Sequence, residues 1–172
     1  KIDDVNIKAL THLPIMYIMK KRFKEAVAMI NKSFKVVKPE VSDYQNLATA
    51  YIELKDYNNA IKSYKKIIKI NPKITEVYKL LGDAQMEIPD HHGAFESYKH
   101  ALDLSPKNFD QLYDLGVVLE HLGGITDSMD LLTEAIEIKP NHVECNNRLA
   151  SCLSANGEYK EANIIYKKLM EW

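Results

Sequence analysis

The sequence contains little cysteine, and what it contains does not predict a disulfide. Its two cysteines, Cys145 and Cys152, lie seven residues apart. On one helix that separation corresponds to a rise of about 10 Å, which is too long for a disulfide. Neither residue belongs to a CxxC motif. We interpret both as small buried side chains, with a reactive thiol as the alternative.

Long apolar stretches are also missing. No segment approaches the roughly 18 apolar residues that a transmembrane helix needs, so we expect no transmembrane segment in this chain. The chain begins at Lys1 rather than at methionine, from which we expect that a preceding part has been removed. The scarcity of cysteine is compatible with a reducing compartment, most simply the cytoplasm, or with a place peripheral to a membrane or organelle.

Motifs that carry enzyme chemistry do not occur in the sequence. It has no GxxxxGK[ST], GxGxxG, HExxH or GxSxG motif. The adjacent His91 and His92 precede a predicted helix, and sequence neighbours point in different directions from a helix. We interpret this pair as part of a solvated turn, with a metal site as the alternative. We therefore expect no catalytic residue, no cofactor and no metal.

Charge is unevenly distributed although the net charge is −1. Residues 1–73 contain 15 Lys and Arg against 7 Asp and Glu, whereas residues 74–172 contain 8 against 17. The two parts thus carry +8 and −9. Such asymmetry affects association rather than fold.

Four lysines share one face of a predicted helix: Lys62, Lys65, Lys66 and Lys69. Nucleic-acid binding would normally add aromatic side chains for base stacking among the lysines. The tyrosines of this region fall instead at positions that we expect to pack in the core. We therefore favour a solvated outer face and do not expect nucleic acid as a partner, although an RNA-binding repeat protein remains the alternative.

The chain repeats itself about every 34 residues. A proline ends each unit, and each unit contains a leucine beside a small residue, a second small residue twelve positions later, and a large residue four positions after that. These positions are Pro39, Pro72, Pro106 and Pro140; Leu47, Leu81, Leu115 and Leu149; Ala48, Gly82, Gly116 and Ala150; Ala60, Ala94, Ser128 and Ala162; and Tyr64, Tyr98, Leu132 and Tyr166.

Each unit is predicted to form two antiparallel helices of about 13–15 residues. Small residues allow two helices to approach closely, and the large residue fills the groove that remains. The proline stops the second helix because it has no N–H to donate. Helix-breaking pairs separate the two helices of a unit: Lys55-Asp56, Pro89-Asp90, Gly123-Gly124 and Gly157-Glu158.

This spacing resembles the tetratricopeptide repeat over about 165 of the 172 residues. The resemblance implies an all-α solenoid of about five helix-turn-helix repeats in a right-handed superhelix. Residues 1–172 would form a single domain with repeats at about 7–40, 41–74, 75–108, 109–142 and 143–172. In repeat number and plan the chain is also similar to magnetosome-associated scaffolds that contain little but such repeats.

Two features depart from the family's pattern. Pro14 occupies the small-residue position of the first repeat, so we expect it to kink the first helix or to make it start late. The fifth repeat ends before its proline. With no helix following in this sequence, we expect an apolar edge near Leu153, Ile165 and Leu169.

The resemblance implies a non-enzymatic scaffold that binds segments of partner proteins in a concave groove lined by the first helix of each repeat. Besides the RNA-binding repeat protein named above, the alternative function is that of a repeat module in a larger enzyme or complex. The groove residues that we expect are Asn46, Thr49, Glu53, Glu76, Lys79, Asp83, Asp110, Asp114, Glu144, Asn147 and Arg148.

The predicted groove has more carboxylates than bases, so we expect basic or mixed-charge partner segments. Some members of the family grip a C-terminal carboxylate with a Lys-Asn-Asn-Lys-Arg clamp. The best register here gives Lys79, Asp83, Asp114, Glu144 and Arg148, whose three carboxylates would repel an acidic tail. The opposite charges of the two parts of the chain also predict a possible homo-oligomer formed by head-to-tail contact.

Overall fold

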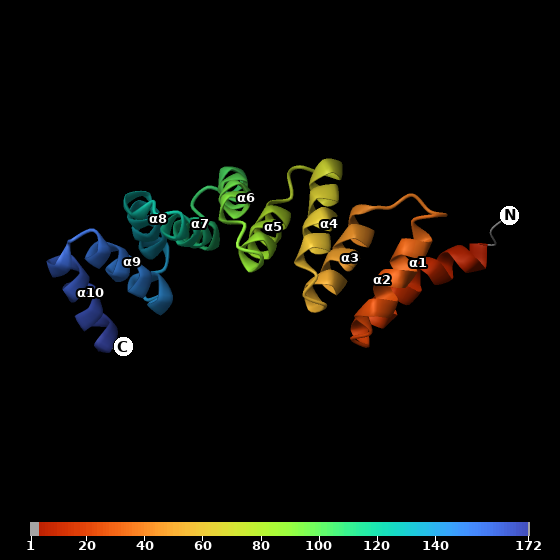
Figure 1. Cartoon of the computed structure of the whole chain (residues 1–172), viewed down its shortest axis with the longest axis horizontal. Coiled ribbons are helices and arrows are strands. Elements are labelled where there is room, and N and C mark those ends of the chain that lie inside the picture. The colour runs from red at the N-terminus through yellow and green to blue at the C-terminus, as the bar shows by residue number, and fades with distance from the viewer. Residues whose placement is uncertain (1–3, 172) are drawn as a thin grey trace. The chain divides into compact units, whose positions relative to one another are not determined.

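The computed structural model describes residues 4–171, and the side chains of residues 9–171. Over these residues the chain forms ten α-helices and no strand (Figure 1). Their bounds are α1 Asp4–Met19, α2 Phe23–Ser33, α3 Val41–Glu53, α4 Tyr57–Ile70, α5 Thr75–Glu87, α6 His91–Leu104, α7 Phe109–His121, α8 Ile125–Ile138, α9 Val143–Ala155 and α10 Tyr159–Met170. The prediction of an all-α repeat fold is confirmed. No helix within the described range is long and apolar enough to cross a membrane.

The helices fall into two compact units, Lys1–Pro89 and Asp90–Trp172. The first unit contains α1 to α5 and the second contains α6 to α10. The boundary lies inside the predicted third repeat, between its two helices. The single domain, the five repeat bounds and the right-handed superhelix stay predictions.

The turn between the two helices of a repeat recurs at a fixed place. A positive φ occurs at Lys21, Lys55, Pro89, Gly123 and Gly157, which are 34 residues apart. The two glycines have φ values of 80° and 87°, a conformation that glycine adopts without a steric penalty. The helix-breaking pairs identified in the sequence therefore mark the turns correctly.

Asp56 and Asp90 show how such a pair also starts the next helix. The side chain of Asp56 accepts a hydrogen bond from the N–H of Asn59 (3.3 Å), and that of Asp90 accepts one from Gly93 (3.0 Å). An N-cap of this kind satisfies a backbone donor that has no partner within the helix. The first residue of each pair thus has a positive φ, and the second residue caps the helix that follows, α4 or α6.

Small residues allow the paired helices to come close together, as their spacing predicts. A Cβ added to Gly116 of α7 would lie 3.1 Å from the side chain of Leu132 on α8, which is too close without movement. Ser128 is fully buried at the same contact, and its Oγ donates to the carbonyl of Gly116 (2.8 Å). The equivalent residues are 0–2% exposed: Ala60, Ala94 and Ala162.

The residues predicted to form the core are mostly buried. Tyr64 and Tyr98 are buried, whereas other tyrosines of the repeat pattern are half-buried: Tyr17, Tyr51, Tyr57 and Tyr166. Cys145 and Cys152 are buried free thiols, which confirms their interpretation as apolar core side chains.

Two predictions about the ends of the array are wrong in part. Helix α1 continues through Pro14, whose ring is buried, so the expected late start is wrong, whereas the expected kink stays a prediction. Leu153 is buried in the core of the second unit rather than exposed at an edge. The exposed apolar side chains of α10 are instead Tyr159, Ile164 and Met170.

The close contacts between helices make a direct prediction about stability. Replacing Ala94, which is fully buried, with leucine should overpack the second unit and lower the free energy of unfolding by roughly 1–3 kcal/mol. Ala28→Leu is the matched control, because Ala28 is exposed on α2 and should change stability by no more than about 0.5 kcal/mol. Urea denaturation followed by circular dichroism measures both. Equal stability of the two variants would contradict the packing.

Candidate functional site

All eleven predicted groove residues lie on the first helices of their repeats, and none is buried. Six are exposed: Thr49, Glu53, Glu76, Asp110, Glu144 and Asn147. Five are half-buried: Asn46, Lys79, Asp83, Asp114 and Arg148. These side chains are therefore accessible on α3, α5, α7 and α9. That they bind a partner together stays a prediction.

Arg148 organises the part of this surface that lies on the second unit. It extends from α9 to α7, where its Nη1 donates to Glu120 Oε2 (2.8 Å) and its Nε donates to Tyr113 Oη (3.3 Å). These contacts join residues 28 and 35 positions apart. They line a pocket of about 310 Å³, whose walls are Tyr113, Glu120, Glu144, Asn147, Arg148 and Ser151.

The hydrogen bonds in this pocket keep the Arg148 side chain positively charged. Burial alone would lower the pKa of Arg148, but the hydrogen bonds to Tyr113 and Glu120 outweigh it and leave that pKa above its ordinary value. The guanidinium is therefore a fixed charge, and Glu120 already neutralises it at 2.8 Å. With Glu144 beside them, the pocket presents net negative charge together with the neutral amide of Asn147.

Asp110 and Asp114 of α7 differ in how freely they face solvent. The exposed Asp110 lies 3.6 Å from Lys139 Nζ, and this ammonium also lies 4.0 Å from the centre of the Phe109 ring. One carboxylate oxygen of Asp114 is buried. Asp110 is thus the more accessible of the two to a partner.

On the first unit, α5 also carries a negative surface. Lys79 Nζ lies 3.2 Å from both carboxylate oxygens of Asp83, so the base of this pair is neutralised within the helix. The pKa of Tyr64 is raised, first by burial and then by the negative charges of Asp83 and Glu76. Both observations indicate an environment that disfavours further negative charge.

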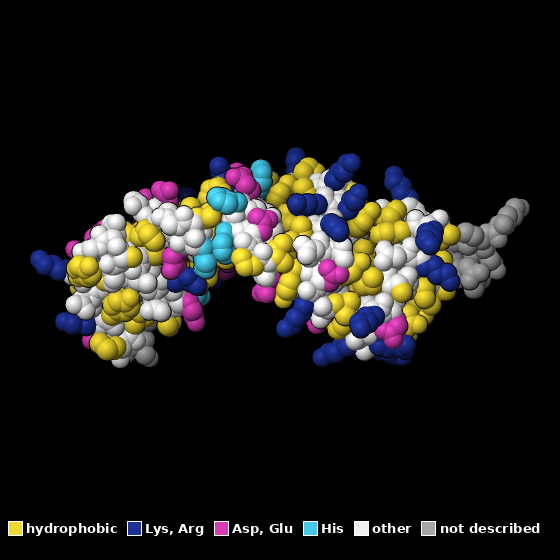
Figure 2. Space-filling model, viewed as in Figure 1, with side chains coloured by type: hydrophobic (Ala, Val, Ile, Leu, Met, Phe, Trp, Pro, Cys, Tyr) yellow, Lys and Arg dark blue, Asp and Glu magenta, His cyan; other side chains and the backbone are white. Residues whose placement is uncertain are grey.

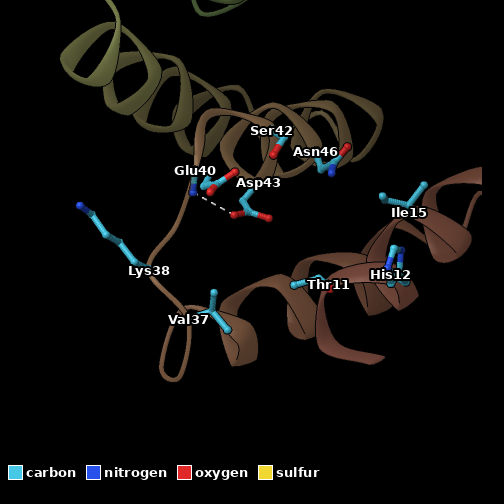
Figure 3. A pocket seen from close by; sticks show the side chains of 9 residues that line it. All are labelled: Thr11, His12, Ile15, Val37, Lys38, Glu40, Ser42, Asp43 and Asn46. Atoms are coloured by element: carbon cyan, nitrogen blue, oxygen red, sulfur yellow. Dashed lines mark hydrogen bonds between the residues drawn. The ribbon is translucent and has the colours of Figure 1, made fainter. Parts of the chain in front are cut away.

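A second pocket, of about 330 Å³, lies between α1 and α3 of the first unit (Figure 3). Thr11, His12 and Ile15 of α1 form one side of it, and Asn46 of α3 lies opposite. The remaining lining residues are Val37, Lys38, Glu40, Ser42 and Asp43. Of the predicted groove residues, only Asn46 belongs to this pocket.

Sequence reasoning missed Glu40 and Asp43 as lining residues, although a local signal for them exists. Glu40 precedes α3, and its backbone N–H donates to Asp43 Oδ2 (2.9 Å). A pair of acidic side chains three residues apart before an apolar run is typical of a helix N-terminus. The pair adds two carboxylates to the lining of this pocket.

The histidine pair was interpreted wrongly in part. His91 is half-buried rather than solvated, and its ring contacts that of His121 at a tilt of 31°, with 5.0 Å between ring centres. Nδ1 of His121 lies 2.8 Å from the carbonyl oxygen of Val117, and His92 is exposed. Within the part of the chain that the structure describes, no three His, Cys, Asp or Glu side chains are grouped to hold a metal ion.

Two segments match family models described as tetratricopeptide repeat, over residues 44–74 and 131–162. These segments fall in the second repeat and across the fourth and fifth. The comparison with curated proteins finds no match.

Solved structures of MamA are similar to this chain along nearly its whole length. One titled "Crystal structure of MamA" has 25% identity and a TM-score of 0.84, and covers 92% of each chain. "Crystal structure of MamA protein" has 24% identity and a TM-score of 0.87, with 96% of this chain and 90% of that one covered. "MamA 41-end from Desulfovibrio magneticus RS-1" has 16% identity and a TM-score of 0.85, with 99% and 96% covered. The likeness shows a shared fold.

The two thiols should be chemically inert in the folded protein. Burial raises the pKa of Cys145 to about 11 and also raises that of Cys152. Because the thiolate is the reactive form, only about one Cys145 in a thousand is ionised at pH 8. Native protein should thus not react with Ellman's reagent at pH 8, while urea-unfolded protein should release two equivalents.

Ser151→Cys supplies the positive control for this measurement, because Ser151 is exposed on α9, the helix that carries both cysteines. Its thiol should react with one equivalent while the protein stays folded. Rapid reaction of the unaltered native protein would contradict the assigned burial.

Proposed function

We propose that this tetratricopeptide-repeat chain, which has the fold of the MamA structures, is a protein-interaction scaffold that holds partner segments on the free faces of its first helices. The observation that carries the proposal is the accessibility of all eleven predicted groove residues on α3, α5, α7 and α9. The opposite faces of these helices contribute to the cores of the two units. Within each unit, such an accessible helix surface suits the binding of a peptide segment.

The charges of this surface favour a basic or mixed-charge segment. Six of its eleven residues are carboxylates, and its two bases are already paired with carboxylates of the same chain. An acidic tail would meet repulsion, so we do not expect this surface to act as a carboxylate clamp. Backbone groups of a bound segment would find hydrogen-bond partners in the amides of Asn46 and Asn147.

A non-enzymatic role is part of this proposal. The titratable side chains of the surface serve salt bridges and helix packing, as in the contact of Arg148 with Glu120. The two thiols of the second unit are held in their protonated form by burial. Neither arrangement activates a nucleophile.

Self-association is the second part of the proposal. The excess of positive charge before residue 74 and of negative charge after it favours contact between the first part of one copy and the second part of another. Such a head-to-tail contact is heterologous and gives rings or open chains. We place the protein in the cytoplasm, or peripheral to a membrane or organelle as in the magnetosome-associated scaffolds.

A pair of labelled peptides tests the inner surface. One peptide alternates Lys or Arg with apolar residues, and the other has Glu in place of each base. We expect fluorescence anisotropy to show binding of the basic peptide alone, and Asp110→Lys with Glu144→Lys to weaken it at least about tenfold. Asp114 is left unchanged because one of its oxygens is buried.

Glu96→Lys with Asp103→Lys is the matched control for this experiment. Both residues are exposed on α6, a second helix, and their reversal changes the net charge by the same amount. This control should keep the affinity of the unaltered chain. An equal loss in both double variants would mean that net charge alone attracts the peptide, and the proposed surface would be wrong.

A further inference from the structure

The outer face of α4 carries a stripe of positive charge. Lys62, Lys65, Lys66 and Lys69 are all exposed, and their spacing of three and four residues places them on one side of the helix. Figure 2 shows lysine and arginine side chains gathered over α4. The helix contains no Asp or Glu, and none of the four lysines pairs with a carboxylate among the described residues. Lys62 donates only to the amide oxygen of Asn59 (3.1 Å).

The same positions two repeats later carry negative charge. Adding 68 residues to the stripe on α4 leads to Asp130, Thr133, Glu134 and Glu137 on α8, all of them exposed. Helix α8 contains no Lys or Arg. Thr133 donates its hydroxyl hydrogen to the carbonyl of Met129 and adds no charge.

Helix α6, in the repeat between them, has an ordinary mixed surface at the equivalent positions. Its stripe is Glu96, Lys99, His100 and Asp103. Opposite charges three or four residues apart attract along a helix, whereas like charges repel. The stripes of α4 and α8 therefore each contain repulsion that a partner of opposite charge would relieve.

We propose that the lysine stripe of α4 in one copy binds the acidic stripe of α8 in a second copy of this chain. The inference rests on the self-association proposed above and locates its contact surface. Lys62 to Lys69 and Asp130 to Glu137 each span seven residues, or about 10 Å of helix. The charges therefore match in spacing whether the two helices run parallel or antiparallel.

Apolar side chains adjoin both stripes at equivalent positions. Ile70 at the end of α4 is 51% exposed, and Ile138 at the end of α8 is 42% exposed. A contact between the two helices would cover part of these side chains and add an apolar contribution that salt does not screen. The ion pairs steer the two copies together and select the register.

A second copy explains more of the pattern than other anionic partners do. An anionic lipid surface or a nucleic acid would account for the lysines of α4, but it would leave the acidic stripe of α8 without a role. The matching stripe at the same repeat position is already present in every copy. Since exposed ion pairs contribute little individually, the contact is weak and sensitive to salt.

Two charge-reversal variants of the whole chain test the contact. The first is Lys62→Glu, Lys66→Glu and Lys69→Glu, and the second is Asp130→Lys, Glu134→Lys and Glu137→Lys. In sedimentation velocity at about 20 mM salt, the unaltered chain should associate with rising concentration, and about 500 mM salt should abolish this. Each variant alone should stay monomeric, because its two stripes then have the same sign.

An equimolar mixture of the two variants gives the decisive result. Association should return to within about threefold of the unaltered affinity, because each variant supplies the stripe that the other lacks. Lys24→Glu, Lys32→Glu and Lys35→Glu alter exposed residues elsewhere with the same change in net charge as the lysine variant, and this control should keep the association that the lysine variant loses. Circular dichroism should show unchanged helicity in all variants.

Three outcomes would overturn the inference. The first is a mixture of the two variants that stays monomeric. The second is a control variant that loses association as completely as the lysine variant does. The third is an unaltered chain that stays monomeric in low salt while it binds phosphatidylserine vesicles or a single-stranded oligonucleotide through α4. Peptide binding by the Asp110 and Glu144 surface is measured separately. Failure of the α4–α8 contact therefore does not count against partner binding. Failure of peptide binding likewise does not count against the α4–α8 contact.

Discussion

The close approach of paired helices at small residues is the contact on which the rest of the structure depends. Between α7 and α8, a Cβ at Gly116 would lie 3.1 Å from the Leu132 side chain and would require it to move, and the Ser128 hydroxyl donates to the backbone carbonyl of Gly116 at the same point. This contact fixes which side of each helix is buried. Because its positions recur every 34 residues, the free faces recur as well, and a residue's position in the repeat determines whether it can meet a partner.

Function in such a chain follows from what the free positions carry. The first helices present mainly carboxylates, and their bases are neutralised by neighbours, as Arg148 is by Glu120. The second helices carry lysines on α4 and carboxylates on α8 at identical repeat positions. A single fold thus displays two chemically different surfaces, one suited to partner segments and one suited to a further copy of the chain.

Much of the fold could be predicted from the sequence because its determinants are local and periodic. The pair Gly123-Gly124 marks a turn by composition alone. Likewise, Asp90 is recognisable in the sequence as the residue that caps α6. Contacts between distant residues have no such signal. The bonds from Arg148 to Tyr113 and Glu120 depend on how α7 and α9 pack, and no pattern within either helix indicates them.

The errors have the same origin. Leu153 was expected at an edge because the fifth repeat has no successor in the sequence, but it is buried in the core of the second unit. His91 was expected in solvent because it follows a turn, but it meets the ring of His121 on the next helix. For both Leu153 and His91, packing against other helices determines how far the side chain is buried. The local sequence pattern carries no information about that packing.

Hydrogen exchange during binding of the basic peptide tests most directly the claim that the first helices carry the partner surface. The measurement compares amide exchange, resolved along the whole chain, with and without saturating peptide at protein concentrations too low for self-association. The account predicts slower exchange in first helices, most of all in α7 and α9, which carry Asp110 and Glu144, with the second helices α8 and α10 unchanged. Slower exchange confined to α8 or α10 would contradict it.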